Sequence, residues 1–425
     1  MAIQAPKGTY DVLPGRSGVW QAVERVMRES AALSGFREVR TPVFEHTELF
    51  QRGVGDTTDV VQKEMYTFTD KGGRSVTLKP EGTAGAVRAM LEAGMHGGPM
   101  PVKMYYINTP IFRYEAPQKG RMREHHQFGV EVFGAPLPTC DAEVIALALR
   151  VIGALGVKDW DLRINSIGCP ECRAEYHKAL RAFLEPRLDK LCGTCVQRFG
   201  KNPLRILDCK VEPCQAELVD APAVLDSLCD GCREHFEGLK AALDALGIPY
   251  VVDARIVRGL DYYTRTVFEV VPSGGGPTIT GGGRYDGLVE QLDGPRLAGF
   301  GFGMGMERLI TLLEEKGGAP EAPRALDVCV APLGEGDRLD ALRLTEELRG
   351  AGIKADMDHV GRSLKAQFRY ADKAGATLVV VVGGDEAGRG GVRLRDFAAR
   401  DEAEVSRGEV VGEIRRRVGG LAFSE

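Results

Sequence analysis

The chain has 425 residues, of which 44% are apolar and 27% charged, and its formal net charge is −5. This length predicts two or three domains with a sizeable core, and the composition excludes a chain that is disordered throughout. No apolar run approaches the roughly 20 residues that span a bilayer, and the N-terminus has no apolar signal core, so we expect a cytoplasmic protein with no membrane segment. The net charge does not indicate nucleic-acid binding, but it is compatible with local basic patches.

The first part of the chain is predicted to form a helix and then several strands. Apolar residues at helical spacing, followed by Gly35, predict a helix over 19–33. Residues 36–45 alternate like a strand, and because they include Pro42 we expect this strand at a sheet edge and near an interface. Further strands are predicted at residues 104–107, 127–133, 267–271 and 300–304. Successive strands with few crossover helices favour an antiparallel sheet.

Two later segments differ from this first body. Residues from about 169 to 240 contain eight of the ten cysteines and predict a helical insert. After a linker rich in Gly, Pro and Glu, an alternation of strands and helices predicts a parallel or mixed α/β domain of about 100 residues. Its strands are expected at 328–331, 354–357 and 378–382, and its helices at 338–349 and 364–374. We therefore expect domains at 1–322 and 325–425.

The cysteines of the insert have the spacing of zinc ligands. They form the pairs Cys169/Cys172, Cys192/Cys195 and Cys229/Cys232, with Cys209 and Cys214 between the second and third pairs. Disulfides are disfavoured in a reducing cytosol, so the spacing alone favours structural zinc. Partly buried thiols without a metal are the alternative, and both interpretations stay open.

Two segments of the first body place polar side chains at the end of a strand. Residues 76–84 end a strand at a proline and bring Glu81 and Thr83 to the start of a helix. There they either bind a ligand, or Thr83 caps the helix and Glu81 is solvated. The Phe-Arg-Tyr-Glu sequence at 112–115 precedes a loop with three cations, which either closes over phosphates or is a solvated hairpin tip.

Residues 258–269 combine a guanidinium with two phenols. Arg258 can hold a phosphate or carboxylate by a two-bonded fork. Tyr262 and Tyr263 can donate to or accept from a small polar ligand. Taken alone, the segment favours an amphipathic strand with Val267 and Phe268 in a core.

Glycines recur in two later segments. Residues 281–283 are three glycines, which either let the backbone lie against a ligand or mark a flexible turn. At 299–305 glycine alternates with large apolar residues, so one face of a strand is bare. Because a bare face weakens a sheet, we expect a flat group such as a purine against it. A helix bearing Arg308 follows directly.

Together these segments resemble a known family. The Pro42 strand, the Phe-Arg-Tyr-Glu unit and the glycine strand ending at Arg308 resemble, in chain order, the three motifs of class II aminoacyl-tRNA synthetases. Arg-Gly-Leu-Asp-Tyr-Tyr at 258–263 and Gly-Gly-Arg-Tyr-Asp-Gly-Leu at 282–288 are similar to the two histidine-specific segments of the histidyl-tRNA synthetase family. Residues 361–376 are similar to its anticodon-binding domain. The resemblance runs almost end to end and is weakest in the insert.

The resemblance implies an α+β catalytic domain with an antiparallel sheet and a helical insert, followed by a C-terminal α/β anticodon-binding domain. It implies a histidine–tRNA ligase, which forms histidyl-adenylate and pyrophosphate from L-histidine and ATP and then transfers histidine to the 3′ end of tRNA(His). Mg²⁺ with ATP, a homodimer and a cytoplasmic location are implied as well. Zinc is not required for catalysis in this family. Arginines and Mg²⁺ suit the first step because they cancel repulsion between the two anions.

The resemblance also implies the site residues, by position. Arg113 and Arg258 would act on the α-phosphate, and Arg258 would also reach the histidine carboxylate. The implied ATP site is Arg113, Glu115, Arg121, Gly303 and Arg308. The implied histidine site is Glu81, Thr83 and Gln127 for the α-amino group, Glu131 and Tyr263 for the imidazole, and Tyr262 and Tyr285 as walls. A neutral imidazole has one N–H donor and one bare nitrogen, so its pocket needs an acceptor and a donor.

One position departs from the family and the tRNA contacts stay open. Ala116 stands where bacterial members often have arginine, which gives Arg121 and Arg123 more weight. Candidate tRNA phosphate contacts are Arg389, Arg393, Arg395 and Arg415–Arg417. For any one of them a solvated surface position is the commoner role.

Two other classes of protein are alternatives to the ligase. A non-catalytic histidine-binding regulatory subunit, a paralogue of the synthetase, would keep the sheet, but it needs neither the phosphate-binding arginines nor the C-terminal domain. A zinc-bound nucleic-acid module without enzyme activity explains only the insert.

Overall fold

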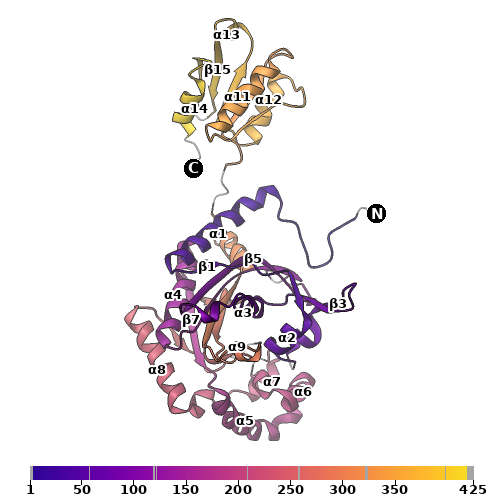
Figure 1. Cartoon of the computed structure of the whole chain (residues 1–425), viewed down its shortest axis with the longest axis vertical. Coiled ribbons are helices and arrows are strands. Elements are labelled where there is room, and N and C mark those ends of the chain that lie inside the picture. Colours follow the sequence, from indigo (N-terminus) through magenta and orange to yellow (C-terminus); the bar gives the residue numbers. More distant parts are fainter. Residues whose placement is uncertain are drawn as a thin grey trace. The chain divides into compact units, whose positions relative to one another are not determined.

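The computed structural model describes residues 3–56, 58–117, 120, 122–207, 209–256, 259–320, 324–397 and 399–418, apart from the side chains of Asn108 and Lys201. The chain divides into two compact units, Met1–Glu321 and Ala322–Glu425 (Figure 1). None of the helices in these described ranges is both long and apolar enough to cross a membrane.

An eight-stranded sheet forms the centre of the first unit. Its strands, in spatial order, are β1 (Arg37–Glu38), β5 (Val102–Phe112), β6 (Glu124–Phe133), β11 (Gly299–Gly305), β10 (Thr280–Arg284), β9 (Thr264–Pro272), β7 (Trp160–Ser166) and β8 (Val251–Val252). Every central pair is antiparallel, and only the short outer strands β1 and β8 pair in parallel with their neighbours. The predicted antiparallel sheet is confirmed.

The two faces of this sheet pack against different helices. One face forms the largest apolar core with α1 (Pro14–Leu33), α4 (Pro138–Ala154), α8 (Asp230–Ala245) and α10 (Met306–Glu315). The other face packs against α3 (Thr83–Glu92) and α9 (Leu288–Gln291), and its core includes four tyrosines. A small sheet of β2 (Phe44–His46), β4 (Ser75–Leu78) and β3 (Tyr66–Thr69) lies beside α2 (Thr47–Val54). The remaining turns are helical at Val60–Glu64 and Met95–Gly97.

The single strand predicted over 36–45 is wrong. The segment forms β1 and β2, which belong to different sheets, with Pro42 in the irregular connection between them. Proline has no N–H to donate to a ladder, so the strand breaks there. The helix predicted from residue 19 begins earlier, at Pro14, since proline is well suited to the first helical position.

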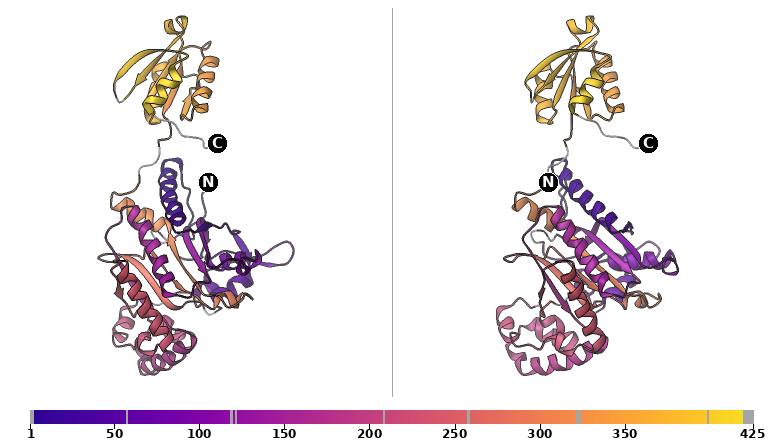
Figure 2. Two further views of the ribbon diagram at one scale, coloured as in Figure 1. Left: turned by 60° about the vertical axis from the view of Figure 1, so that its left-hand side comes forward. Right: turned by 90° about the vertical axis from the view of Figure 1, so that its left-hand side faces the viewer.

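The helical insert lies between β7 and β8. Its elements are α5 (Pro170–Leu184), α6 (Gly193–Lys201) and α7 (Glu212–Glu217), the single turns Glu185–Lys190, Pro203–Ile206 and Val224–Ser227, and the start of α8. It has its own core, centred on Tyr176, Leu180 and Ile206 together with cysteines. Figure 2 shows these helices gathered at one end of the first unit.

The second unit is an α/β domain with a five-stranded sheet. Its strand order is β13 (Ala355–Met357), β12 (Val328–Pro332), β14 (Leu378–Val382), β15 (Gly391–Asp396) and β16 (Asp401–Ser406). The first three strands are parallel and the last two antiparallel, as the predicted mixed α/β class allows. The helices are α11 (Arg338–Gly350), α12 (Leu364–Lys373), α13 (Asp385–Gly388) and α14 (Val410–Val418). The β15–β16 hairpin was not predicted, because β16 is mostly exposed and has no apolar pattern.

Candidate active site

A buried carboxylate, Glu131 on β6, is the centre of a cluster of polar side chains beside α3. Its side chain is 1% exposed. Thr83 Oγ1 donates a hydrogen bond to Glu131 Oε1 over 2.8 Å, and the Tyr106 hydroxyl donates to the same oxygen over 3.2 Å. The Tyr285 hydroxyl donates to Oε2. Burial raises the pKa of Glu131 to about 8, although the hydroxyl donors act in the opposite direction.

Tyr106 is a partner of Glu131 that the sequence did not reveal. It lies on β5 opposite Gly129 of β6. A Cβ atom at Gly129 or at Gly82 would lie 2.3 or 2.4 Å from the Tyr106 ring, so both glycines are needed to admit it. The only trace in the sequence is Gly129 itself, a glycine inside an otherwise apolar strand.

Glu81 caps the helix that carries Thr83. The Glu81 carboxylate accepts hydrogen bonds from the backbone N–H groups of Thr83 and Ala84, over 2.7 and 2.8 Å. The alternative in which Thr83 caps and Glu81 is solvated is wrong, because Glu81 is 5% exposed and the Thr83 hydroxyl points to Glu131. Burial raises the pKa of Glu81 as well.

The rings of three tyrosines pack together beside Glu131. The ring centroids of Tyr262 and Tyr263 are 4.7 Å apart, and those of Tyr262 and Tyr285 are 5.6 Å apart. All three side chains are buried. Burial holds the pKa values of Tyr262 and Tyr285 well above the usual range, so their hydroxyls keep their protons at neutral pH.

The glycines of β10 and β11 make room for protein atoms. A Cβ atom at Gly282 would lie 2.0 Å from the carbonyl oxygen of Gly301, and one at Gly283 would lie 2.5 Å from that of Thr266. These glycines therefore lie in a strand whose neighbours approach closely, and of the two alternatives for 281–283 the flexible turn is wrong. On β11, a Cβ atom at Gly301 would meet the Glu131 carboxylate at 2.2 Å.

Gln127 occupies the space at Gly303. A Cβ atom at Gly303 would lie 2.3 Å from Gln127 Nε2. Gly303 and Gln127 are half-buried, whereas Gly301 and Glu131 are buried. The glycine face of β11 is therefore more exposed to solvent at Gly303 than at Gly301. The placement of a purine near Gly303 stays a prediction.

Comparisons with known proteins place the chain in a family. Residues 8–309 match the family model "Histidyl-tRNA synthetase", and residues 327–417 match the model "Anticodon binding domain". A histidine–tRNA ligase of Alkaliphilus oremlandii is 55% identical over 95% of this chain and 96% of its own length. The chain belongs to the histidyl-tRNA synthetase family. The predicted activity, ATP-dependent ligation of histidine to tRNA by a class II synthetase, is confirmed.

Solved structures agree with this assignment. Apo histidyl-tRNA synthetase of S. aureus superposes with a TM-score of 0.82 at 38% identity, covering 97% of this chain and 100% of that chain. A protein of Bacillus halodurans C, described as an ATP phosphoribosyltransferase regulatory subunit/histidyl-tRNA synthetase, has a TM-score of 0.62 at 20% identity. It covers 87% of this chain and 97% of its own. At that identity the second likeness shows the fold alone.

The arginines predicted to bind phosphates in this synthetase are described in part. Arg113 follows β5 and is one-fifth exposed, with Nε donating to the Pro80 carbonyl over 2.8 Å and Nη1 lying 3.8 Å from the Glu64 carboxylate. Arg308 is half-buried at the start of α10, and its Nη1 donates to the Thr278 carbonyl over 3.3 Å. Arg121 and Arg258 lie outside the described residues.

The loop after Arg113 is held by Arg123. Its Nε donates to the carbonyl of Glu115 over 3.1 Å, and its guanidinium lies 4.2 Å from the ring centroid of Tyr114. Gly120, with φ +71°, comes within reach of Arg308, because a Cβ atom there would lie 3.0 Å from Arg308 Cγ. Gly120 thus lies beside Arg308, which is also predicted to bind a phosphate of ATP.

Most of the candidate tRNA contacts of this synthetase pair with acids of their own unit. Arg389 bonds Glu404 over 2.9 and 3.1 Å, while Arg393 pairs with Glu386 and Glu402. The other pairs are Arg395 with Glu402, and Arg416 and Arg417 with Glu413. These partners fit solvated surface arginines, and a role for each in tRNA binding stays a prediction.

Among the residues that the structure describes, eight cysteines are placed so that they could hold metal ions. They form two groups, Cys169/Cys172/Cys229/Cys232 and Cys192/Cys195/Cys209/Cys214. All ten cysteines of the chain are free thiols. The sequence did not show which pairs combine.

Proposed function

We propose that histidine binds with its imidazole N–H donating to Glu131. The observation that carries this is the arrangement of donors around that carboxylate: three hydroxyls reach its two oxygens, which together offer about four acceptor positions. In the ionised carboxylate, one acceptor position therefore remains for the ligand. A buried acceptor of this kind favours a ligand that brings its own donor, because an unpaired buried group is costly.

The other groups of the ligand are assigned to the residues around Glu131. Tyr263 is proposed to donate to the bare imidazole nitrogen, with Tyr262 and Tyr285 as walls. Glu81, Thr83 and Gln127 are proposed to bind the α-amino group. Burial of Glu81 and its two bonds from the α3 backbone support this, since they fix a carboxylate where a cation can compensate it. A site that bonds both nitrogens rejects ligands lacking them by roughly 10⁴-fold.

ATP is proposed to bind on the side of Arg113 and Arg308. Their half-buried guanidinium groups fit a chain of phosphates, and Arg113 is held in place by Pro80 and Glu64. Arg113 and Arg258 are proposed to act on the α-phosphate, Arg121 and Arg308 on the outer phosphates, and Glu115 and Gly303 at the adenine.

Mg²⁺ is proposed to enter with ATP, and it would neutralise charge on the phosphates. The first step makes a bond from the histidine carboxylate to the α-phosphorus and releases pyrophosphate. In the second step the terminal adenosine hydroxyl of tRNA(His) attacks the acyl carbon and AMP leaves. No protein nucleophile is assigned, and positioning by arginines supplies much of the rate.

The organisation of the protein completes the proposal. Residues 1–322 are proposed as the catalytic domain, with the insert at about 169–240, and residues 325–425 as the domain that binds the anticodon. The protein is proposed to be a cytoplasmic homodimer with the Pro42 region near the dimer interface.

Histidine-dependent exchange of pyrophosphate into ATP tests the site. Arg258→Ala should lower exchange by several orders of magnitude, about 10³-fold or more, while the circular dichroism spectrum stays that of the wild type. Near-normal exchange in the folded variant would refute the role of Arg258. The same assay separates the ligase from a regulatory subunit. A regulatory subunit should show no exchange, so exchange by the wild-type protein would exclude that class.

A further inference from the structure

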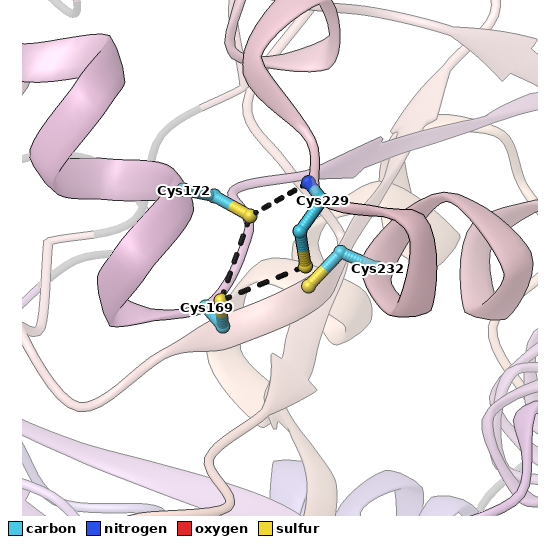
Figure 3. A group of neighbouring side chains, drawn as sticks. All are labelled: Cys169, Cys172, Cys229 and Cys232. Atoms are coloured by element: carbon cyan, nitrogen blue, oxygen red, sulfur yellow. Dashed lines mark hydrogen bonds between the residues drawn. The ribbon is translucent and has the colours of Figure 1, made fainter.

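The eight cysteines of the insert converge on two points. Within each group of four, all sulfur atoms lie within 4.8 Å of one another. Figure 3 shows the first group, in which the sulfurs of Cys169 and Cys172 at the start of α5 face those of Cys229 and Cys232 at the start of α8. Helices that are distant in the chain thus present their thiols to a common centre.

The sulfur separations fit a single tetrahedral ion. The Cys169 sulfur lies 3.5 Å from that of Cys172 and 3.9 Å from that of Cys229, and the Cys192 sulfur lies 3.9 Å from that of Cys209. Four sulfurs at about 2.3 Å from zinc define edges of about 3.8 Å. Disulfide sulfurs are only about 2.05 Å apart. A cluster of several irons and sulfides needs a wider cage, since its inorganic core occupies the centre.

The backbone around both groups is arranged for thiolates. Cys169, Cys192 and Cys229 each take the N-cap position of a helix, where the backbone dipoles favour negative charge. The N–H of Cys192 donates to the Cys214 sulfur and the N–H of Cys229 to the Cys172 sulfur, both over 3.1 Å. Within the first group, the bond links the pair Cys169/Cys172 to the pair Cys229/Cys232. Within the second group, it links Cys192 to Cys214.

Besides the cysteines, the small core of the insert contains eight buried apolar side chains. Of its three complete helices, α6 has nine residues and α7 six, and the connections are single turns. A core this small seldom folds without a metal or cross-links. We propose that each group binds one Zn²⁺ through four thiolates, and that the two ions brace the segment 259–265 that carries Tyr262 and Tyr263.

The first group connects to this segment through α5 and the residue before Cys169. Arg173 of α5 donates to the carbonyl of Tyr263 over 3.2 Å. The N–H of Arg265 donates to the carbonyl of Gly168 over 2.9 Å. Gly168 has φ +66°, and a Cβ atom there would lie 2.4 Å from Cys172 Cβ, so the group requires glycine at this position.

The second group connects to the same segment through the loop between Cys195 and Cys209. Asn202 Nδ2 donates to the Asp261 carboxylate over 3.2 Å, and Arg205 donates to the carbonyl of Gly259. Arg205 also lies 3.3 Å from the Asp59 carboxylate, which anchors the loop to the catalytic sheet domain. Zinc at each group would therefore restrain a different part of the segment 259–265.

Metal analysis tests the two ions directly. Full-length protein purified without chelator should contain about two zinc ions per chain by mass spectrometry. The variants Cys169→Ser/Cys229→Ser and Cys192→Ser/Cys209→Ser should each retain about one. The matched control, Cys140→Ala/Cys329→Ala, changes the two cysteines outside the groups and should retain both ions. Less than about 0.1 equivalent of zinc in the wild type, or iron in its place, overturns the proposal.

Kinetics tests the bracing, which rests on the proposed histidine site. In pyrophosphate exchange, each double serine variant should raise the KM for histidine about tenfold and leave the KM for ATP within about twofold. Returning ZnCl₂ to wild-type protein stripped by a chelator should restore the histidine KM. An equal rise in the KM for histidine and the KM for ATP, or no rise in either, refutes the bracing. If exchange were absent in zinc-loaded wild type, the proposed function would fail while the zinc sites stood.

Discussion

The proposed histidine site and the cysteine insert both gather buried polar groups, but they satisfy them by different means. In the pocket, three hydroxyl donors surround the Glu131 carboxylate, so donors and acceptors complete one another. In the insert, four sulfurs of the same kind meet at each centre, and a backbone N–H donates to one sulfur of each group, Cys214 in one and Cys172 in the other. Like groups that converge need a cation, whereas mixed donors and acceptors can leave one position for a ligand.

Removing the carboxylate at the centre of the pocket should have the largest effect. Glu131→Ala deprives the imidazole of its acceptor and leaves three hydroxyls without theirs, so kcat/KM for histidine in pyrophosphate exchange should fall by about 10⁴-fold. The KM for ATP should stay near that of the wild type. A fall of less than tenfold in a folded variant would contradict the role of Glu131.

Removing one donor should have an intermediate effect. Tyr106→Phe deletes one hydrogen bond to a buried carboxylate, so kcat/KM for histidine should fall about tenfold. Tyr105→Phe is the matched control: its hydroxyl bonds Glu38, away from the pocket, and the variant should behave as the wild type. Equal effects of the two variants would show that Tyr106 acts only through packing.

The pH dependence of histidine activation should report on Glu131. Burial raises its pKa to about 8, and the neighbouring Glu81 also raises it. Below that pH the carboxyl is protonated and is a weaker acceptor, so kcat/KM for histidine should rise severalfold from about pH 7 to about pH 9. Glu131→Gln does not titrate and should lose this rise. An unchanged slope in Glu131→Gln would assign the pH dependence to another group.

Removing the C-terminal unit should affect histidine activation least. The pocket and both cysteine groups lie within the first compact unit. A protein lacking residues 324–425 should therefore keep exchange within about twofold of the wild type, because compact units fold on their own cores. It should lose tRNA charging, measured with tRNA(His). Normal charging by this protein would contradict the assignment of 325–425 to the anticodon.

The parts of the fold that the sequence predicted are those with local patterns. The run Leu378–Val382 forms β14 with the predicted bounds, because five apolar β-branched or leucine residues specify a buried strand. The β15–β16 hairpin was missed because its outer strand is polar. The strand through Pro42 was divided between two sheets, which no local pattern could show.

The residues of the candidate site were predicted from their resemblance to family motifs more than from physical patterns in the sequence. Glu131 was identified through the family resemblance, but its partner Tyr106 is separated from it by 25 positions and carries no motif. Nothing local distinguishes Tyr106 from Tyr105, since only the register of β5 against β6 puts Tyr106 on the pocket face. The arginines at 121 and 258 remain predictions from the resemblance.

The sequence by itself determined the family, the activity and the presence of zinc-like cysteine pairs, because each depends on residue type at short spacing. Tertiary structure alone decided which cysteine pairs combine. It also decided that Tyr106 faces Glu131 and which glycines make room for the Tyr106 ring. Those relations join residues that are distant in the chain, such as Cys169 with Cys229 and Tyr285 with Glu131, and only folding brings such residues within bonding distance.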